Sequence, residues 1–436
     1  MTWKYSDQGV KSVADKALVP LQGFTVGTGQ ENIFARLFLL LRDTYILSTL
    51  LFFLLRLDSY LFQMGMLPIS PIILLVAWIG SIWILSVVST YFEGQYALIF
   101  TRSLPIIIPF AAIVGFSWVG IFLEEAYFDQ NYKAVLLPTL DFLLFLTGVA
   151  IGMMHISKWK WSTTVAIAFL VVIVTVFVDA LYPGTFSKLD YRASGIYEQP
   201  NIAAFSMVLF LTVLLRWEKK ALNWQDMILA VVCGVGIFFT FSRGGVVEFL
   251  LIALLYLINL KNKERVSFFI KGAGLLICLG GVIVFLLPDY LSQLEILQFK
   301  SARMEWFTGD VGGALSTSDA RVRILDEYYP LIASSPLWGK GSGYVTSMWL
   351  GPHNIYVARW VENGIFGVLS YVWWLLAILF LNKKMKNFSG VAIVILLIAY
   401  GFISHHLLEE RPILLLLSIL TTRAVAGNVF AAEKKE

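Results

Sequence analysis

Five polar residues could support a group-transfer reaction in a chain that otherwise carries little charge. They are Arg192, Arg243, Arg321, Arg323 and His353. A guanidinium group keeps its charge and binds phosphate oxygens through two parallel N–H groups. A neutral imidazole can take the proton of an attacking hydroxyl group. This set suits displacement of a lipid diphosphate from a sugar, because arginines stabilise the charge that grows on the leaving group. That chemistry does not itself require a metal ion.

Each of these residues also has a structural explanation. Arg192 could extend to lipid headgroups, and the two loop arginines could be ordinary solvated charges. His353 could be a capping or interfacial residue. Arg243 lies between two apolar runs, where a charge is costly unless it is paired or faces water. Glu248 follows five residues later and lies off the same helical face, so we favour a ligand-facing role for Arg243.

The other histidines and the cysteines do not predict a metal centre or a cofactor. We interpret His155 as structural. His405 and His406 each precede a glutamate by four residues, a spacing that can share a metal, but ion pairing with Arg411 is the favoured use. The two cysteines lie in apolar runs without CxxC spacing, which excludes a disulfide framework or a zinc site. The sequence has no nucleotide-binding loop motif, and the run GKGSG at 339–343 is interpreted as a flexible turn.

The composition is that of a membrane protein. Hydrophobic residues make up 58% of the 436 residues and charged residues 14%, whereas soluble domains have about 25% charged residues. The net charge of +4 is too small for a nucleic-acid-binding arm, so nucleic acid is not a predicted partner. The apolar composition instead predicts the lipid bilayer as a partner. A span needs about 20 apolar residues. Twelve such spans are predicted, at 37–55, 71–90, 104–123, 134–154, 163–182, 201–215, 225–241, 244–259, 268–287, 357–380, 389–405 and 412–428.

Basic residues predict the orientation of these spans. If the N-terminus lies on the inner side of the membrane, 20 of the 33 Lys and Arg residues fall on that side. Six fall on the outer side when the long loop and Arg359 are not counted. Short cytoplasmic loops carry the excess of basic residues, so both termini are predicted to be cytoplasmic. The predicted divisions are a cytoplasmic segment (1–36), helices one to nine (37–287), a large outer loop (288–352), helices ten to twelve (353–428) and a cytoplasmic tail (429–436).

The predicted tenth span must position the histidine. Pro352 is expected to start this helix, which would place His353 in the first turn at the outer surface. A helix N-terminus disfavours an imidazolium ion, so a neutral imidazole is expected there. On the same face, Tyr356 is followed by Gly364 and Gly367, which would let another helix approach closely.

Four motifs that follow one another on the predicted outer side resemble those of the O-antigen ligase/polymerase superfamily. The motifs are RASG…QPN (192–201), FSRG (241–244), PLWGKG (336–341) and PHNIY…ENGIFG (352–367). The resemblance implies an all-α polytopic membrane protein of GT-C-like fold, with about twelve transmembrane helices and one large periplasmic loop that carries short helices. It also implies the bacterial inner membrane and a periplasmic active site.

The resemblance further implies an inverting, metal-independent glycosyltransferase. Such an enzyme moves a glycan from undecaprenyl diphosphate to an acceptor hydroxyl group. His353 would be the general base, and Arg192, Arg243 and one of the two loop arginines, Arg321 or Arg323, would bind the diphosphate. The supporting residues would be Gln199, Asn201, Ser242, Asn354, Tyr356 and Glu362.

The members of this superfamily differ in the acceptor to which they transfer the glycan. A ligase uses lipid A-core, a polymerase uses a second lipid-linked glycan, and protein O-oligosaccharyltransferases use Ser or Thr. The single long loop favours a ligase of lipopolysaccharide biosynthesis, with a polymerase as the alternative. A transporter of lipid-linked glycans is disfavoured, because inverted repeats and polar residues at the bilayer midplane are missing from the sequence pattern.

Overall fold

The computed structural model describes residues 33–93, 96–123, 128–187, 192–197, 199–268, 270–272, 274, 324–348, 351–405 and 407–433. In these ranges the chain forms helices, turns and irregular segments, and no strand. It divides into two compact units, 1–44 and 45–436. The first unit is described only over 33–44, which is helical. All features discussed below belong to the second unit.

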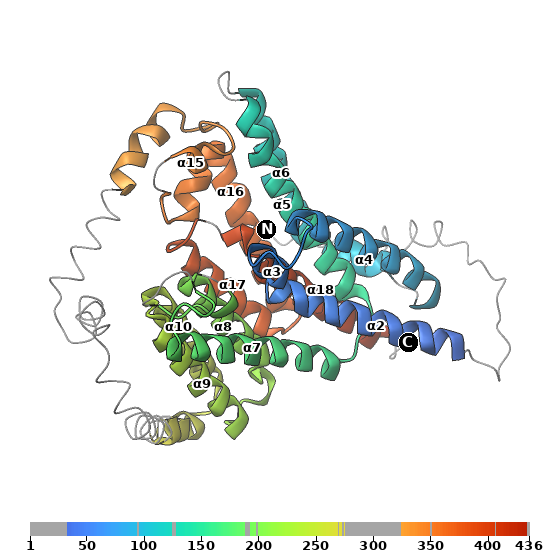
Figure 1. Cartoon of the computed structure of the whole chain (residues 1–436). Helices are drawn as coiled ribbons and strands as arrows, with labels where there is room; N and C mark the ends of the chain where they lie inside the picture. Colours follow the sequence, from blue (N-terminus) through green and yellow to red (C-terminus); the bar gives the residue numbers. More distant parts are fainter. Residues whose placement is uncertain are drawn as a thin grey trace, which may run out of the picture. The chain divides into compact units, whose positions relative to one another are not determined.

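The helices coincide with the apolar runs of the sequence (Figure 1). Their bounds are α2 (Ile33–Leu54), α3 (Leu57–Gln63), α4 (Pro71–Glu93), α5 (Tyr96–Leu123), α6 (Phe128–Met153), α7 (Lys158–Leu181), α8 (Pro200–Leu214), α9 (Trp224–Thr240), α10 (Arg243–Asn259), α15 (Tyr344–Ser347), α16 (Ile355–Lys384), α17 (Phe388–Gly401) and α18 (Arg411–Glu433). Three short 3-10 helices are η1 (Gly195–Tyr197), η2 (Trp217–Lys219) and η3 (Leu407–Glu409).

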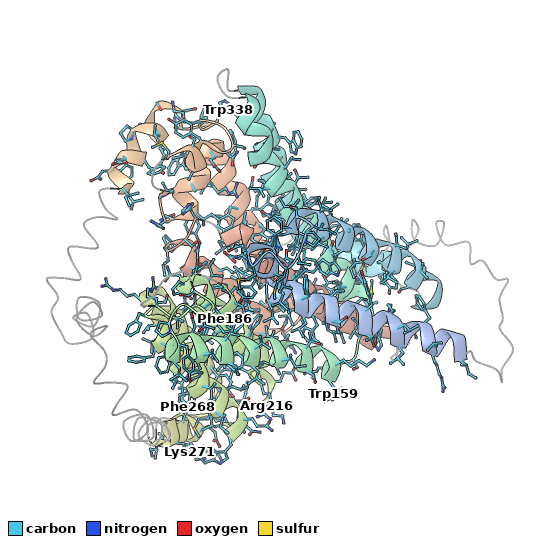
Figure 2. All side chains as sticks on the ribbon, in the orientation of Figure 1. Trp159, Phe186, Arg216, Phe268, Lys271 and Trp338 are labelled. Carbon is cyan, nitrogen blue, oxygen red and sulfur yellow. The ribbon has the colours of Figure 1, made fainter. Side chains whose placement is uncertain are left out.

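The apolar helices support a multi-pass membrane protein. Seven of the described helices are long and apolar enough to cross a membrane, and three further apolar helices, α8, α9 and α17, are shorter. Every predicted span except 268–287 coincides with a described helix, and most of 268–287 lies outside the described residues. Figure 2 shows Arg216 and Lys271 at one end of the second unit and Trp338 at the opposite end.

Two groups of helices form the second unit. In one, α5 packs on α6 and α16, and α18 packs on α6; in the other, α8 contacts α7, α9, α10 and α17. Small residues permit the close α6–α18 contact, because a methyl group on Gly148 would overlap Ser418 and one on Gly152 would overlap Thr422. The polar residues of the cavity described below come from the ends of these helices and the segments between them.

The start of α16 corrects the predicted position of His353. The Asn354 side chain accepts hydrogen bonds from Tyr356 N (2.9 Å) and Val357 N (3.2 Å), so Asn354 is the N-cap and the helix begins at Ile355. His353 has a left-handed backbone (φ 48°) and therefore precedes the helix instead of lying in its first turn. The prediction was wrong because an asparagine N-cap determined the helix start, and Pro352 did not.

A break in α16 receives the turn at 336–343. Gly364 has non-helical angles (φ 64°, ψ −162°), and Ile365 N donates to Pro336 O at 3.0 Å. On the other side of the break, Lys340 N donates to Val361 O at 2.6 Å and Gly341 N to Glu362 O at 3.0 Å. The run GKGSG is therefore held by backbone hydrogen bonds, which corrects its interpretation as a flexible turn. The absence of a side chain on Gly364 therefore makes room for this turn, and not for a neighbouring helix.

Candidate active site

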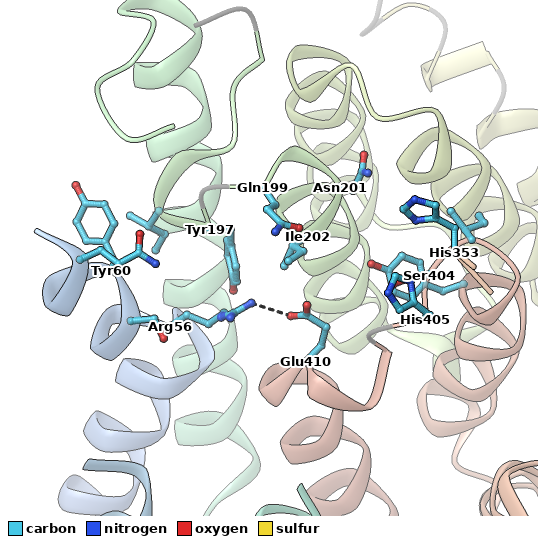
Figure 3. A pocket seen from close by; sticks show the side chains of 15 residues that line it. Arg56, Tyr60, Tyr197, Gln199, Asn201, Ile202, His353, Ser404, His405 and Glu410 are labelled. Carbon is cyan, nitrogen blue, oxygen red and sulfur yellow. Dashed lines mark hydrogen bonds and ion pairs between the residues drawn. The ribbon is translucent and has the colours of Figure 1, made fainter. Parts of the chain in front are cut away.

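A polar cavity of about 500 Å³ lies between the α2–α3 corner, η1, the start of α8 and the His353 segment (Figure 3). This volume is within the range of small-molecule sites. Three residues predicted from the sequence line it together, namely His353, Gln199 and Asn201. They come from segments about 150 residues apart, which the packing of α17 between α8 and α16 brings to one place.

His353 lies on the wall of this cavity with its side chain exposed. Its imidazole ring packs edge-to-face against that of His405, with ring centroids 5.5 Å apart and planes at 76°. His405 in turn packs on Gly351, where a Cβ atom would overlap the imidazole ring. The left-handed backbone of His353 is uncommon for a residue with a side chain, and such conformations concentrate at functional sites. The geometry therefore presents two imidazoles to a ligand in the cavity, of which that of His353 is the more exposed.

The buried carboxylate of Asp179 binds the backbone of the segment that precedes Gln199 and Asn201. Asp179, at the end of α7, is 2% exposed. Its Oδ1 atom accepts from the backbone N–H groups of Phe186 and Ser187, both at 3.1 Å. Its Oδ2 atom accepts from Ser194 N (2.8 Å) and Gly195 N (3.3 Å). The sequence analysis did not identify Asp179, although a lone carboxylate at the end of an apolar run is an indication of such a role.

Replacing Asp179 with alanine should destabilise the protein and strongly reduce ligand binding. Four backbone N–H groups would lose their acceptor, and each buried donor without a partner costs about 1–3 kcal/mol. Thermal unfolding of the purified protein in detergent measures the effect. The matched control is Asp326→Ala, because Asp326 is exposed on the helix at 324–334. Equal melting temperatures for both variants would contradict the role of Asp179.

Two further predicted residues, Arg192 and Ser242, contact Asn201 beside the cavity. The Oδ1 atom of Asn201 accepts from Arg192 Nη2 and from Ser242 Oγ, both at 3.0 Å. Arg192 also donates from Nε to Thr240 O at 3.1 Å. Ser242 is the N-cap of α10 and accepts from Gly245 N at 3.1 Å. Arg243 follows Ser242 directly as the first, half-buried residue of α10. Arg192 thus joins the η1 segment to the α9–α10 junction.

The remaining predicted residues support α16 and the 336–343 turn. Glu362 accepts from Gly343 N at 3.1 Å and pairs with Arg359 at 3.8 Å. Tyr356 donates from its hydroxyl group to Ile398 O at 3.2 Å, which joins α16 to α17. Asn354 caps α16, as described above. Arg321 and Arg323 lie outside the described residues, so their role stays a prediction.

The α2–α3 corner adds an ion pair that the sequence analysis missed. Arg56 Nη1 lies 3.2 Å from Glu410 Oε2, and both residues line the cavity. Next to this pair, Arg411 binds the buried Asp58. The described ion pairs of Glu410 and Arg411 thus lead to the α2–α3 corner, whereas the predicted pairing of Arg411 with His406 and Glu409 lies outside the described side chains. Within the described part of the chain, no group of three or more His, Cys, Asp or Glu residues could hold a metal ion.

Tyr197 fixes this corner from the η1 side. Its hydroxyl group donates to Leu54 O at 2.6 Å. Burial raises the pKa of Tyr197 above its ordinary value, so the phenol stays protonated and remains a donor. The floor of the cavity is thus tied together by a neutral hydrogen bond and by two ion pairs.

The fold and the cavity define a multi-pass membrane protein with an accessible histidine in a polar site. Residues 228–372 match the family model described as O-antigen ligase. The matched segment includes Arg243, the 336–343 turn, His353 and Glu362. The match supports the resemblance to the O-antigen ligase/polymerase superfamily and a membrane enzyme of that type. No curated protein matches the chain.

Proposed function

We propose that the protein transfers a glycan from undecaprenyl diphosphate to an acceptor hydroxyl group on the periplasmic side of the inner membrane. The observation that carries the proposal is the accessible His353 imidazole, which shares one polar cavity with Gln199 and Asn201. The family match covers the histidine and the arginine at the start of α10. The favoured acceptor is lipid A-core, which makes the protein an O-antigen ligase. The alternative is a polymerase that uses a second lipid-linked glycan.

In the proposed reaction His353 acts as the general base. The imidazole takes the proton of the acceptor hydroxyl group while the acceptor oxygen bonds to the anomeric carbon. The bond from that carbon to the diphosphate oxygen breaks, and its electron pair leaves with the diphosphate. Attack opposite the leaving group inverts the anomeric centre. Arg192, Arg243 and a loop arginine, Arg321 or Arg323, stabilise the departing charge without a metal ion.

Replacing Arg243 with lysine should reduce transfer about tenfold or more. Lysine keeps the charge but loses the planar fork that binds two phosphate oxygens at once. Initial rates with saturating acceptor and varied donor measure the change. The control is Arg102→Lys, because Arg102 is an exposed arginine of α5 away from the cavity. Unchanged turnover in the Arg243 variant would assign this residue a structural role.

Purified protein in detergent tests the function directly. One reaction contains the lipid-diphosphate glycan with lipid A-core, and a second contains the lipid-linked glycan alone. Glycosylated lipid A-core would support a ligase, and a ladder of lengthening lipid-linked glycan would support a polymerase. No transfer in either reaction would contradict the proposal and favour a protein acceptor or a transporter.

A further inference from the structure

Arg56 has an unusual backbone at the floor of the cavity. It lies between α2 and α3 with left-handed angles (φ 52°, ψ 31°), which are uncommon for a residue with a side chain. The corner around it is fixed by the hydrogen bond from Tyr197 to Leu54 O and by the ion pair of Asp58 with Arg411. These contacts hold the strained residue in place and direct its side chain to the cavity.

The guanidinium group of Arg56 uses little of its hydrogen-bonding capacity on the protein. Among the described residues it makes one hydrogen bond, from Nη1 to Glu410 Oε2 at 3.2 Å. Its side chain is 27% exposed, whereas that of Glu410 is 7% exposed. Arg192 differs, because its Nε and Nη2 atoms donate to Thr240 O and Asn201 Oδ1. Arg56 is also the one arginine among the described residues that line the cavity.

The surroundings of Arg56 suit an oxyanion. Ser59, Gln63 and Gln199 line the same cavity and can donate hydrogen bonds to oxygen atoms. In Figure 3, Arg56 and His353 lie on opposite sides of Glu410, and both line the same cavity. A guanidinium group with unused N–H groups in a polar cavity is a strong phosphate ligand.

We propose that Arg56 binds a phosphate group in this cavity and that Glu410 orients its guanidinium group. The inference rests on the proposed function for the origin of the phosphate, which is the diphosphate of the donor or a phosphate group of the acceptor. Because Glu410 is negative and lies beside the phosphate site, it repels the ligand that Arg56 attracts. Removing the Arg56 guanidinium group should therefore weaken phosphate binding, whereas removing the charge of Glu410 should not. A purely structural ion pair would show similar effects for both removals.

Calorimetry with inorganic pyrophosphate tests the proposal on the full-length protein in detergent. Arg56→Gln should weaken binding at least tenfold, and Arg56→Lys should restore part of the loss. Glu410→Gln should bind as tightly as the unmodified protein or several-fold more tightly. Melting temperatures of all variants are measured in parallel, so that loss of fold is separated from loss of binding.

The ion pair of Arg216 with Asp226 supplies a matched control, because the Arg216 side chain is 27% exposed, as that of Arg56 is. The double variant Arg216→Gln, Asp226→Asn replaces this pair with two amides that can still form a hydrogen bond, and neither residue lines the cavity. Its pyrophosphate affinity should stay within about twofold of the unmodified protein. Equal weakening by Arg56→Gln and Glu410→Gln, or undiminished binding in Arg56→Gln, would overturn the proposal.

The transfer assay then identifies which substrate carries the phosphate. A raised KM for the donor in Arg56→Gln assigns the donor diphosphate, and a raised KM for the acceptor assigns a phosphate of the acceptor. Unchanged KM values for both would refute the role of Arg56 in the reaction. If the unmodified protein transfers no glycan, the proposed function fails, whereas the pyrophosphate measurement still decides whether Arg56 binds phosphate.

Discussion

Replacing His353 with alanine should lower glycan transfer by a factor of about 10²–10⁴, the range in which general-base catalysis contributes. The imidazole lines the cavity and is exposed, so its removal leaves no buried gap and should leave the fold intact. The measurement is the initial rate at saturating donor and acceptor, where loss of a base appears in kcat and not in KM.

A second exposed histidine provides the control for this prediction. His155 lies between α6 and α7 and does not line the cavity, so His155→Ala should keep full activity. Thermal unfolding of both variants should give the same melting temperature as the unmodified protein. Full transfer activity in the His353 variant would remove the base assignment, and with it the main support for the proposed reaction.

Replacing Gly364 with alanine should cause a large loss of stability. A Cβ atom there would lie 2.5 Å from Trp338 N and would overlap the Leu337 carbonyl group. Both obstacles are backbone atoms, so no side-chain rotation relieves them. The backbone angles of Gly364 add strain of about 1–3 kcal/mol for a residue with a side chain. The melting temperature in detergent should fall by about 5 °C or more.

Gly115 on α5 gives the matched substitution for this experiment. A Cβ atom on Gly115 would meet no heavy atom within 4 Å, and its backbone is helical. Gly115→Ala should therefore keep the melting temperature or raise it slightly, because alanine favours helices. Similar unfolding curves for the two variants would contradict the docking of the 336–343 turn on the break in α16.

The apolar runs predicted the described helices well, because a membrane span requires a long stretch without charge. Two details were predicted wrongly, namely the start of α16 and the packing partner of Gly364. Pro352 and Asn354 both favour the start of a helix, and only the hydrogen bonds of the Asn354 side chain show which of them caps α16. Similarly, Gly364 in an apolar helix predicted close helix packing, while its partner is a turn that precedes it by more than 20 residues.

The site was predictable where its residues occur in motifs on one predicted side of the membrane. His353, Gln199 and Asn201 belong to such motifs, and all three line the cavity. Arg56 was not predictable, because Glu410 is 354 residues away in the sequence and each residue alone resembles an interfacial charge. Contacts of this kind depend on how helices from the two ends of the chain pack.

The turn at 336–343 docks on α16 mainly through backbone atoms, and this has an evolutionary consequence. Selection at such a joint acts on chain geometry and hardly on side-chain chemistry. Diverged relatives are therefore expected to keep small residues at the positions of Gly339 and Gly364, where a Cβ atom would meet backbone. Lys340 contacts α16 through its main-chain N–H group and should vary freely. Spacing between glycines would then identify distant relatives better than the charged residues beside them.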